Sequence, residues 1–327
     1  MTTTASATRS RAARRRRRPQ PSPSPALLVW LVLGIVYLFW GSTYLGIRIM
    51  VEDMPPLSAA GGRFLGAGVI LLLILAATRG LRSLRVTGRQ LVGLALLGLL
   101  LPACGNGLMT VGEQSVASGI AALLAAGVPV WVILLRTASG DRPRPLTWLG
   151  VLLGLGGLVV LVARSGSGET STPFGVLVVL LASMGWSLGS WWQGRLTLPA
   201  DPFVATVYEM LLGGGFMMAG GWLAGERIDL GAYATSSWLA WCYLVVFGSL
   251  VGFSAYVWLL GKAPLSLVAT YAYVNPVVAV VLGALVLAEP VTATVLVGGA
   301  IVVAGVAVVV SAERPSRRTT EAAAPSA

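Results

Sequence analysis

The sequence contains no histidine, few charged residues and only two cysteines. Without histidine the chain has no histidine general base, and most transition-metal sites are excluded. We therefore predict no metal, no cofactor and no enzymatic activity. Cys104 and Cys242 both lie in apolar runs, where inert packing is the favoured interpretation and a disulfide between them stays open. No Walker sequence or other nucleotide-binding motif occurs, which argues against direct use of ATP.

Long apolar runs are what the sequence has in abundance. Of its 327 residues, 56% are hydrophobic and only 11% are charged, against roughly 25% charged residues in an ordinary soluble domain. Runs of about 20 apolar residues span a bilayer as helices, and these runs do not alternate with polar residues as barrel strands do. The sequence predicts an all-α integral membrane protein with ten transmembrane helices, near residues 27–49, 57–77, 90–110, 115–135, 145–163, 173–193, 202–223, 236–258, 264–287 and 290–311.

The basic residues predict how these helices sit in the membrane. The first apolar run is long and lacks a small-residue cleavage site, so we interpret it as the first span and not as a signal peptide. With the amino terminus inside, the Arg-rich loops 78–89 and 136–144 are cytoplasmic, and only Arg164 and Arg227 fall in outer loops. Because cytoplasmic loops collect Lys and Arg, we expect a multi-pass protein of the cell (inner or plasma) membrane with both termini cytoplasmic.

Polar segments flank the membrane region. Residues 1–26 form a predicted disordered, Arg-rich cytoplasmic tail, and residues 312–327 form a second disordered cytoplasmic tail. An arginine cluster attracts phosphate of any kind, so nucleic acid is an alternative partner. Contact with anionic lipid suits a basic tail beside a membrane better. We predict lipid and a small-molecule substrate as partners and no nucleic acid, and the oligomeric state is left open.

Self-similarity divides the membrane region into two halves. A shift of 146 to 148 residues superimposes similar features along five helices. They are Trp40 and Trp186, Pro56 and Pro202, Arg63 and Glu209, Gly105 and Gly252, Pro129 and Pro276, and the Gly150/Gly157 and Gly298/Gly305 pairs. The predicted repeats cover 27–165 and 173–311. Because each half has an odd number of spans, the two are expected to be inverted repeats, an arrangement that in transporters places the substrate site between the halves.

Ionisable residues at membrane depth are expensive and usually face protein or water. Arg63 lies six residues into the second span and Glu209 seven into the seventh, counted from opposite faces of the membrane. Their long side chains are expected to approach each other if the two helices are neighbours. One interpretation is a structural ion pair or snorkelling, and the other is a substrate-carboxylate contact for Arg63 and a protonation site for Glu209. Arg48 is expected to snorkel from its helix end. Glu113 stands at the outer mouth before the fourth span and is expected to be a solvated loop charge, with a place in the lining of the entrance as the alternative.

Aromatic and hydroxyl residues cluster in the first helix of each half. Trp40, Ser42 and Tyr44 lie in the first span, and Trp186 and Ser190 lie in the sixth. Anchoring at the membrane interface, and hydrogen bonds from the hydroxyls to their own helix, are alternative explanations. An aromatic pair supplied by both halves suits a cavity for amphipathic or ring-bearing solutes.

The third, fourth and ninth spans carry further unusual residues. Asn106 stands between two glycines and is either a helix-packing residue or a substrate contact. Pro276 has no N–H, so we expect the ninth span to kink there, and Pro129 predicts a kink in the fourth. Tyr271 and Asn275 are four residues apart and share a helix face. We predict that both contact the substrate.

Four stretches, "WGSTYLGIRI", "PPLSAAGGRFLGAG", "GNGLMTVGEQSVASGIAALLAAGVPVW" and "TYAYVNPVVAVVLG", resemble a known family. In this order they are similar to the EamA family of the drug/metabolite transporter superfamily, and within it to the YedA-like inner-membrane permeases. The resemblance covers roughly residues 27–311. It implies ten helices in two inverted repeats, a central cavity, and transport of small metabolites, often outward. It assigns no proton-coupling role to Glu209.

The leading hypothesis is a secondary transporter that exports small metabolites, such as amino acids or amphipathic drug-like compounds, by alternating access through a central cavity. The alternatives are a non-transporting membrane scaffold or sensor and a membrane lipid-handling enzyme. Glu209 is the only carboxylate well inside a predicted span, which disfavours the enzyme because paired acids are missing. The predicted substrate-binding residues are Trp40, Ser42, Tyr44, Arg63, Asn106, Trp186, Ser190, Glu209, Tyr271 and Asn275.

Overall fold

The structure, a computed structural model, describes residues 25–140, 144–165, 171–263, 265–268 and 270–313. These residues are helical except for connecting loops and one isolated bridge between Val116 and Ser171. In chain order the helices are α1 (Pro25–Met50), α2 (Pro56–Arg79), η1 (Leu81–Leu84), α3 (Gly88–Gly98), η2 (Leu99–Gly107), α4 (Leu108–Gly112), α5 (Ser118–Ala125), α6 (Val128–Ala138), α7 (Pro145–Ser165), α8 (Pro173–Gln193), α9 (Pro202–Leu223), α10 (Thr235–Tyr243), η3 (Leu244–Phe253), α11 (Ser254–Leu260), α12 (Leu265–Val268), α13 (Tyr271–Leu287) and α14 (Ala293–Glu313).

The all-helical prediction is confirmed for these residues. Seven helical stretches in the described part of the chain are long and apolar enough to cross a membrane, and three shorter apolar helices accompany them. Each predicted apolar run coincides with one helix or a row of consecutive helices. The number of membrane crossings and the inverted relation of the halves stay predictions. Residues 1–24 and 314–327, which hold nearly all of the two predicted tails, lie outside the described residues.

The surface and the interior have the polarity that a bilayer requires. Large apolar side chains point outward, including Leu285 at 78% exposure and Trp222 at 77%. Charged side chains are found inside, where Arg63 is 1% exposed and Glu209 is completely buried. Lipid offers no hydrogen bonds, so apolar groups face it while polar groups gather between helices.

Two proline-containing spans are interrupted, but in different ways. The fourth predicted span breaks completely, because α5 ends at Ala125 and α6 begins at Val128. Pro129 is then near the start of α6, where its missing N–H has no helical acceptor to lose. In the ninth span Thr270 is a turn residue that precedes α13, and α13 continues through Pro276.

The third and eighth predicted spans share another irregularity. Each begins and ends as an α-helix but is π-helical in the middle, over η2 (Leu99–Gly107) and η3 (Leu244–Phe253). Wider π-helical turns are rare and are found mostly at functional sites. Pro102, which lies within η2, contributes because proline cannot donate the regular helical bond.

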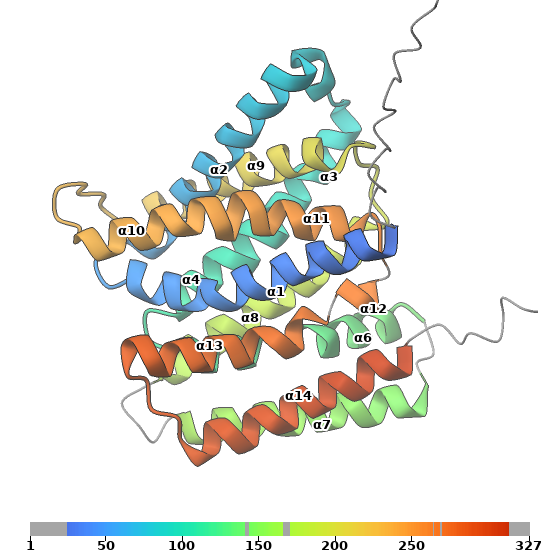
Figure 1. Ribbon diagram of the computed structural model, residues 1–327, viewed down its shortest axis with the longest axis vertical. Helices are drawn as coiled ribbons and strands as arrows, with labels where there is room; N and C mark the ends of the chain where they lie inside the picture. The colour runs from blue at the N-terminus through green and yellow to red at the C-terminus, as the bar shows by residue number, and fades with distance from the viewer. Residues whose placement is uncertain (1–24, 141–143, 166–170, 264, 269, 314–327) are drawn as a thin grey trace, which may run out of the picture.

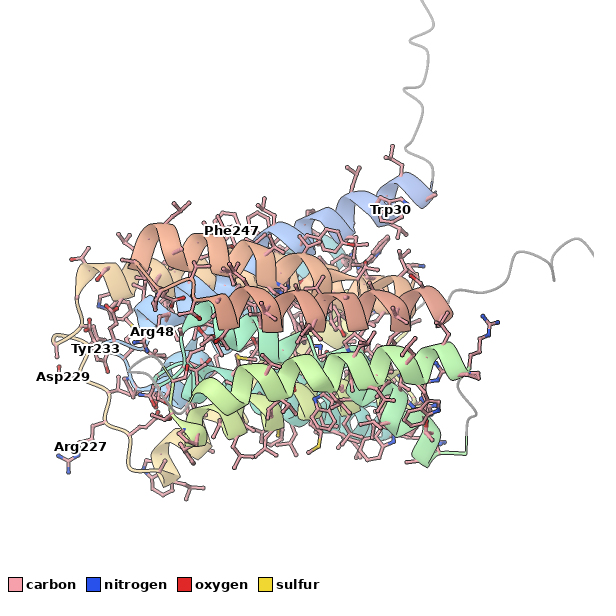
Figure 2. The ribbon with its side chains drawn as sticks, turned by 90° about the horizontal axis from the view of Figure 1, so that it is seen from below. Trp30, Arg48, Arg227, Asp229, Tyr233 and Phe247 are labelled. Atoms are coloured by element: carbon pink, nitrogen blue, oxygen red, sulfur yellow. The ribbon has the colours of Figure 1, made fainter. Side chains whose placement is uncertain are left out.

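The helices from the two halves are interleaved. Figure 1 shows α1 crossing the middle of the molecule beside α11 and α13, while α7 and α14 lie side by side along one edge. α2 packs along α9, and α8 packs against η2, α4 and α6. Close α7–α14 packing depends on glycine, because a Cβ at Gly150 would lie 2.7 Å from the Val309 nitrogen. Figure 2 labels Arg48 near the last turn of α1 and Trp30 near its first, and these residues name the two ends of the molecule, the Arg48 end and the Trp30 end.

Two glutamates fasten helices together at the Arg48 end. Glu226, after α9, accepts hydrogen bonds from the Leu57 and Ser58 nitrogens of α2 at 3.0 and 2.7 Å. Glu289, after α13, accepts from the Ser118 nitrogen of α5 at 2.8 Å and from the Ser118 hydroxyl at 2.8 Å. We call these the Glu226 clamp and the Glu289 clamp. Both combine a carboxylate with helix N-terminal N–H groups, a favourable electrostatic arrangement.

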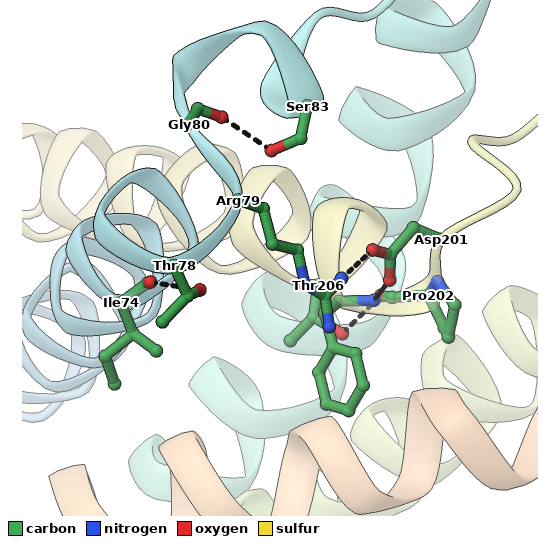
Figure 3. A network of polar contacts seen from close by, with 9 residues as sticks. Ile74, Thr78, Arg79, Gly80, Ser83, Asp201, Pro202 and Thr206 are labelled. Carbon is green, nitrogen blue, oxygen red and sulfur yellow. Dashed lines mark hydrogen bonds and ion pairs between the residues drawn. The ribbon is translucent and has the colours of Figure 1, made fainter.

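At the other ends of α2 and α9, an ion pair joins the same two helices. Figure 3 shows Arg79 paired with Asp201, which also caps α9 by accepting a hydrogen bond from the Phe203 nitrogen at 2.9 Å. Among the described residues this is the only ion pair. The α2–α9 pair is therefore tied at both ends, and the helices that surround the interior are held in place by it.

Candidate functional site

A cavity of about 70 Å³ lies among helices of both halves. Most of the predicted site residues line it, namely Trp40, Tyr44, Arg63, Asn106, Trp186, Tyr271 and Asn275. The remaining lining residues are Thr43, Ile47, Gly105, Met109, Ala125, Val128, Ala182, Ser183 and Gly248. The walls are mainly apolar and aromatic, with a few polar groups among them, as is usual for small-molecule sites.

Arg63 is the only basic residue in this cavity wall. Its Nε donates to the Ser249 hydroxyl of η3 at 2.8 Å, and its Nη2 donates to Asn106 Oδ1 of η2 at 3.1 Å. Within the described part of the chain, its Nη1 has no hydrogen-bond partner. The two π-helical segments thus fix the guanidinium from both sides and leave one donor group free. A positioned guanidinium with a free N–H is suited to binding an anionic group such as a carboxylate.

Arg63 and Glu209 do not form the structural ion pair that was one interpretation of them. The acidic residue close enough to act electrostatically on Arg63 is Glu113. Glu209 is buried in α9, does not line the cavity, and interacts electrostatically with Tyr256. Matching positions in two repeats do not have to pair, even though α2 and α9 pack against each other.

An aromatic cluster closes the cavity toward the Trp30 end. Trp40 and Trp186, one from each half, have ring centroids 5.3 Å apart at 82°, which is a T-shaped contact. Tyr256 lies 4.8 Å from Trp40, and Tyr271 lies 5.4 Å from it. We call Trp40, Trp186, Tyr256 and Tyr271 the aromatic floor. The predicted pairing of the two tryptophans is seen directly in this geometry.

Hydrogen bonds hold the aromatic floor together. Trp186 Nε1 donates to the Tyr256 hydroxyl at 3.2 Å, and this hydroxyl is also bonded to Ser190 at 2.8 Å. Trp40 Nε1 donates to the Gly248 carbonyl at 3.1 Å. Ser190 therefore supports the floor from behind and does not line the cavity. Buried rings with satisfied N–H and O–H groups form a rigid surface.

The other predicted site residues divide between the cavity and its surroundings. Ser42 is bonded to Tyr243 at 2.5 Å and to carbonyls of its own helix, outside the cavity. Tyr271 and Asn275 both line the cavity from α13, as their four-residue spacing predicted. Asn275 is 2% exposed, and its Oδ1 has no partner among the described residues. That acceptor is available to a bound solute.

The side of the cavity toward the Arg48 end differs from expectation. Glu113, predicted to be a solvated loop charge, is completely buried. Arg48, predicted to snorkel, instead donates through Nη1 to the Glu113 and Gln114 carbonyls at 2.7 and 2.9 Å. Arg48 also lines a recess of about 550 Å³, together with Gln114 and Glu289. We call the segment around Glu113 and Arg48 the outer wall.

Sequence reasoning missed several residues of the site. Ser249 and Gly248 of η3 orient Arg63 and Trp40, and Met109 lies in the wall of the cavity. The matched positions Gly105 and Gly252 were a signal for η2 and η3, but hydropathy does not distinguish a π-helix from an α-helix. The cysteines, for which packing and a disulfide were both open, are free, and Cys242 is exposed.

Comparisons with known proteins agree with this architecture. The model of the EamA-like transporter family matches residues 27–163 and 173–311. The inner membrane transporter YedA of Escherichia coli (strain K12) is 42% identical over 250 residues, covering 76% of this chain and 79% of that protein. The transporter YoaV of Bacillus subtilis (strain 168) is 24% identical over 283 residues, covering 85% and 96%.

One solved crystal structure supports the fold independently. It has a TM-score of 0.64 and 21% sequence identity, and the match covers 88% of this chain and 99% of that chain. At this identity the likeness speaks for the fold alone. The family match extends over most of the chain, and the identity to YedA is high over most of both proteins. The chain is therefore a member of the EamA-like transporter family.

Proposed function

We propose that this protein is a secondary transporter that moves small amphipathic solutes with an anionic group, such as amino acids, by alternating access. The observation that carries the proposal is the central cavity, which sets the anchored Arg63 guanidinium opposite aromatic walls supplied by both halves. The aromatic rings suit the apolar part of such a solute, and the free Nη1 of Arg63 suits its carboxylate. Family membership and transporter relatives agree with a non-enzymatic function.

The size of the cavity supports a conformational cycle. Sites for small organic molecules usually measure about 300–1,000 Å³, whereas this cavity measures about 70 Å³. This conformation thus offers less space than such a site needs, and we propose that the walls separate when solute binds. We propose that the two halves are inverted repeats, and that the outer wall and the opposite face open in turn.

The finer features of the proposal follow the charge pattern and the relatives. We propose ten membrane crossings, both termini cytoplasmic and net movement outward. The location we propose is an inner membrane, because the relative YedA is an inner membrane transporter. The Arg48 end then faces outward, and the Arg-rich loops face the cytoplasm, as the positive-inside rule requires. Among the described residues no group of three or more potential metal ligands occurs, and the proposed cycle uses none.

Counterflow in reconstituted vesicles tests the proposal. Vesicles containing the protein are loaded with a panel of unlabelled L-amino acids and aryl carboxylates, and entry of each labelled compound is measured. We expect counterflow of at least one compound, lost in Arg63→Met and retained in the control Arg82→Met, which removes an exposed arginine. Absence of counterflow for the whole panel, or equal activity of Arg63→Met and the original protein, contradicts the proposal.

A further inference from the structure

Glu113 occupies an unusual position for a carboxylate. It directly follows α4, at the end of an apolar span, and its nitrogen bonds to the carbonyl of Met109, which lines the cavity. On its other side the neighbouring Gln114 and Ser115 line the recess. Glu113 therefore lies in the outer wall between the recess and the central cavity.

The carboxylate of Glu113 has no hydrogen bonds. It is completely buried, and within the described residues both Oε1 and Oε2 lack partners. An ionised carboxylate without hydrogen bonds is very costly in a buried position, so such a group takes up a proton or meets a ligand or water. By contrast, the carboxylates of the two clamps are fully engaged with N–H and O–H groups.

Charged groups of both signs surround Glu113. Arg48 of α1 and Arg63 of α2 act on it with positive charge, and Glu289, after α13, acts with negative charge. Tyr44 of α1 is also within electrostatic reach. From α8, Gly175 and Val179 pack against Gly112, and neither of them titrates. Burial, followed by the Glu289 charge, raises the pKa of Glu113 well above its ordinary value, against the opposing effect of the two arginines.

We propose that Glu113 is the proton-binding site that couples the transport cycle to pH. In the closed conformation it carries a proton, and opening of the outer wall toward the recess hydrates the carboxylate and releases that proton. This role rests on the transporter function proposed above. It assigns the coupling to a residue outside the solute cavity, next to the guanidinium that holds the solute's anionic group.

The direction of the pH effect follows from linkage. The closed conformation binds the proton more tightly than the open, hydrated one, so low pH favours closure and high pH favours opening. Each unit of difference between the pKa values of Glu113 in the two conformations changes the closed-to-open ratio about tenfold. The effect is complete only when pH rises above the raised pKa of the closed conformation.

The first test detects the proton directly and needs no solute. Infrared difference spectra of the purified full-length protein in lipid nanodiscs are recorded over a pH titration, and the C=O stretching band of protonated carboxyl groups is followed. We expect Glu113→Gln to remove one component of this band at neutral pH. The control Glu52→Gln, which neutralises an exposed carboxylate in the recess, should leave the band unchanged.

The second test measures opening of the outer wall. Met109→Cys, in a background with Cys104→Ser and Cys242→Ser, places one thiol in the cavity wall. The rate at which a maleimide labels this thiol is measured in two proteins, one with Glu113 and one with Glu113→Gln. The first rate is divided by the second, and this ratio cancels the pH dependence of the thiol's own reactivity. We expect this ratio to be near one at acidic pH and to rise about tenfold or more at alkaline pH. The Glu52→Gln protein should show the same rise as the protein with both glutamates.

The outcomes separate this inference from the proposed function. The expected band and labelling ratio without any counterflow support proton binding at Glu113 and contradict transport. Counterflow that persists while Glu113→Gln changes neither the infrared band nor the labelling ratio overturns the coupling role and leaves the transport function standing. A labelling ratio that stays near one at every pH also overturns it.

Discussion

The aromatic floor and the outer wall close the same cavity with opposite chemistry. On the floor, four rings pack at centroid distances near 5 Å. Both indole N–H groups donate hydrogen bonds, and the Tyr256 hydroxyl is bonded to Trp186 and Ser190. In the outer wall, both oxygens of the buried Glu113 carboxylate lack partners among the described residues. The floor is a satisfied packing arrangement, whereas the wall keeps polar groups that gain from contact with water or solute.

This difference indicates whether the aromatic floor or the outer wall opens at the lower cost in free energy. Separating the floor breaks ring contacts worth about 0.5–1.5 kcal/mol each beyond area burial, together with its hydrogen bonds. Opening the wall hydrates groups that lack partners in the closed form, which offsets part of the loss. The wall is also thin, since Met109 and Gln114, only five residues apart, line the cavity and the recess. The Glu289 clamp and the Arg48 hydrogen bonds to the Glu113 and Gln114 carbonyls are among the contacts on this side.

The largest expected effect comes from removing a ring of the floor. Trp186→Ala deletes a side chain that contacts Trp40, Tyr256 and Phe253, and we expect a loss of about 3–5 kcal/mol in stability. Thermal unfolding in detergent measures the loss. The control Trp222→Ala, at an exposed position, should unfold near the original temperature. Equal destabilisation by both changes would show that the floor is not a special packing unit.

The next largest effect separates the two clamps. Glu289→Gln weakens charge-assisted bonds to Ser118 and Gly119, and we expect it to destabilise the protein by about 1.5–3 kcal/mol. Glu226→Gln should cost a similar amount. Only Glu289→Gln should also speed maleimide labelling of Met109→Cys, because Glu289 lines the recess beside the wall. Faster labelling in both variants, or in neither, contradicts a gating role for this clamp.

A smaller effect is expected from the hydroxyl of Tyr256. Tyr256→Phe keeps the ring but leaves Trp186 Nε1 unpaired, for an expected loss of about 1–2 kcal/mol in thermal unfolding. Tyr243→Phe is the matched control, because its partner Ser42 keeps a bond to the Phe39 carbonyl at 2.8 Å. A larger loss for Tyr243→Phe would mean that floor hydrogen bonds add little.

The smallest effect on stability is expected at Asn275. Its Oδ1 makes no hydrogen bond among the described residues, so Asn275→Ala should change stability by less than about 0.5 kcal/mol. Counterflow by this variant should nevertheless fall, because the amide faces the cavity. Unchanged counterflow with a clear loss of stability would assign Asn275 to packing instead of solute binding.

Much of the fold was predictable because a membrane-spanning helix needs a long run of apolar residues, which is visible in the sequence. Apolar runs of membrane length, separated by basic loops, predicted helical segments that coincide with those observed. The matched tryptophans predicted a cavity flanked by Trp40 and Trp186, and the four-residue spacing of Tyr271 and Asn275 predicted a shared face. These inferences needed only helical periodicity and the preferences of side chains for lipid or protein.

Other features depended on contacts between distant segments. Hydropathy placed Glu113 in a loop, and a loop charge is normally solvated, but packing of α4 against α8 and the approach of α1 bury it. Pairing Arg63 with Glu209 failed because alignment of repeats gives equivalence and not proximity. Arg63 of α2 donates to Ser249 and Asn106 because η3 and η2 pack beside α2 in the folded protein.

The sequence by itself determined that this protein is a helical membrane protein of a transporter family, because length, hydropathy and motif order are local properties of the chain. Only the tertiary structure decided which polar residues remain without partners. That property depends on how helices from both halves surround a side chain, and no single segment contains it. The unpartnered carboxylate of Glu113 and the free nitrogen of Arg63 are therefore properties of the assembled helices.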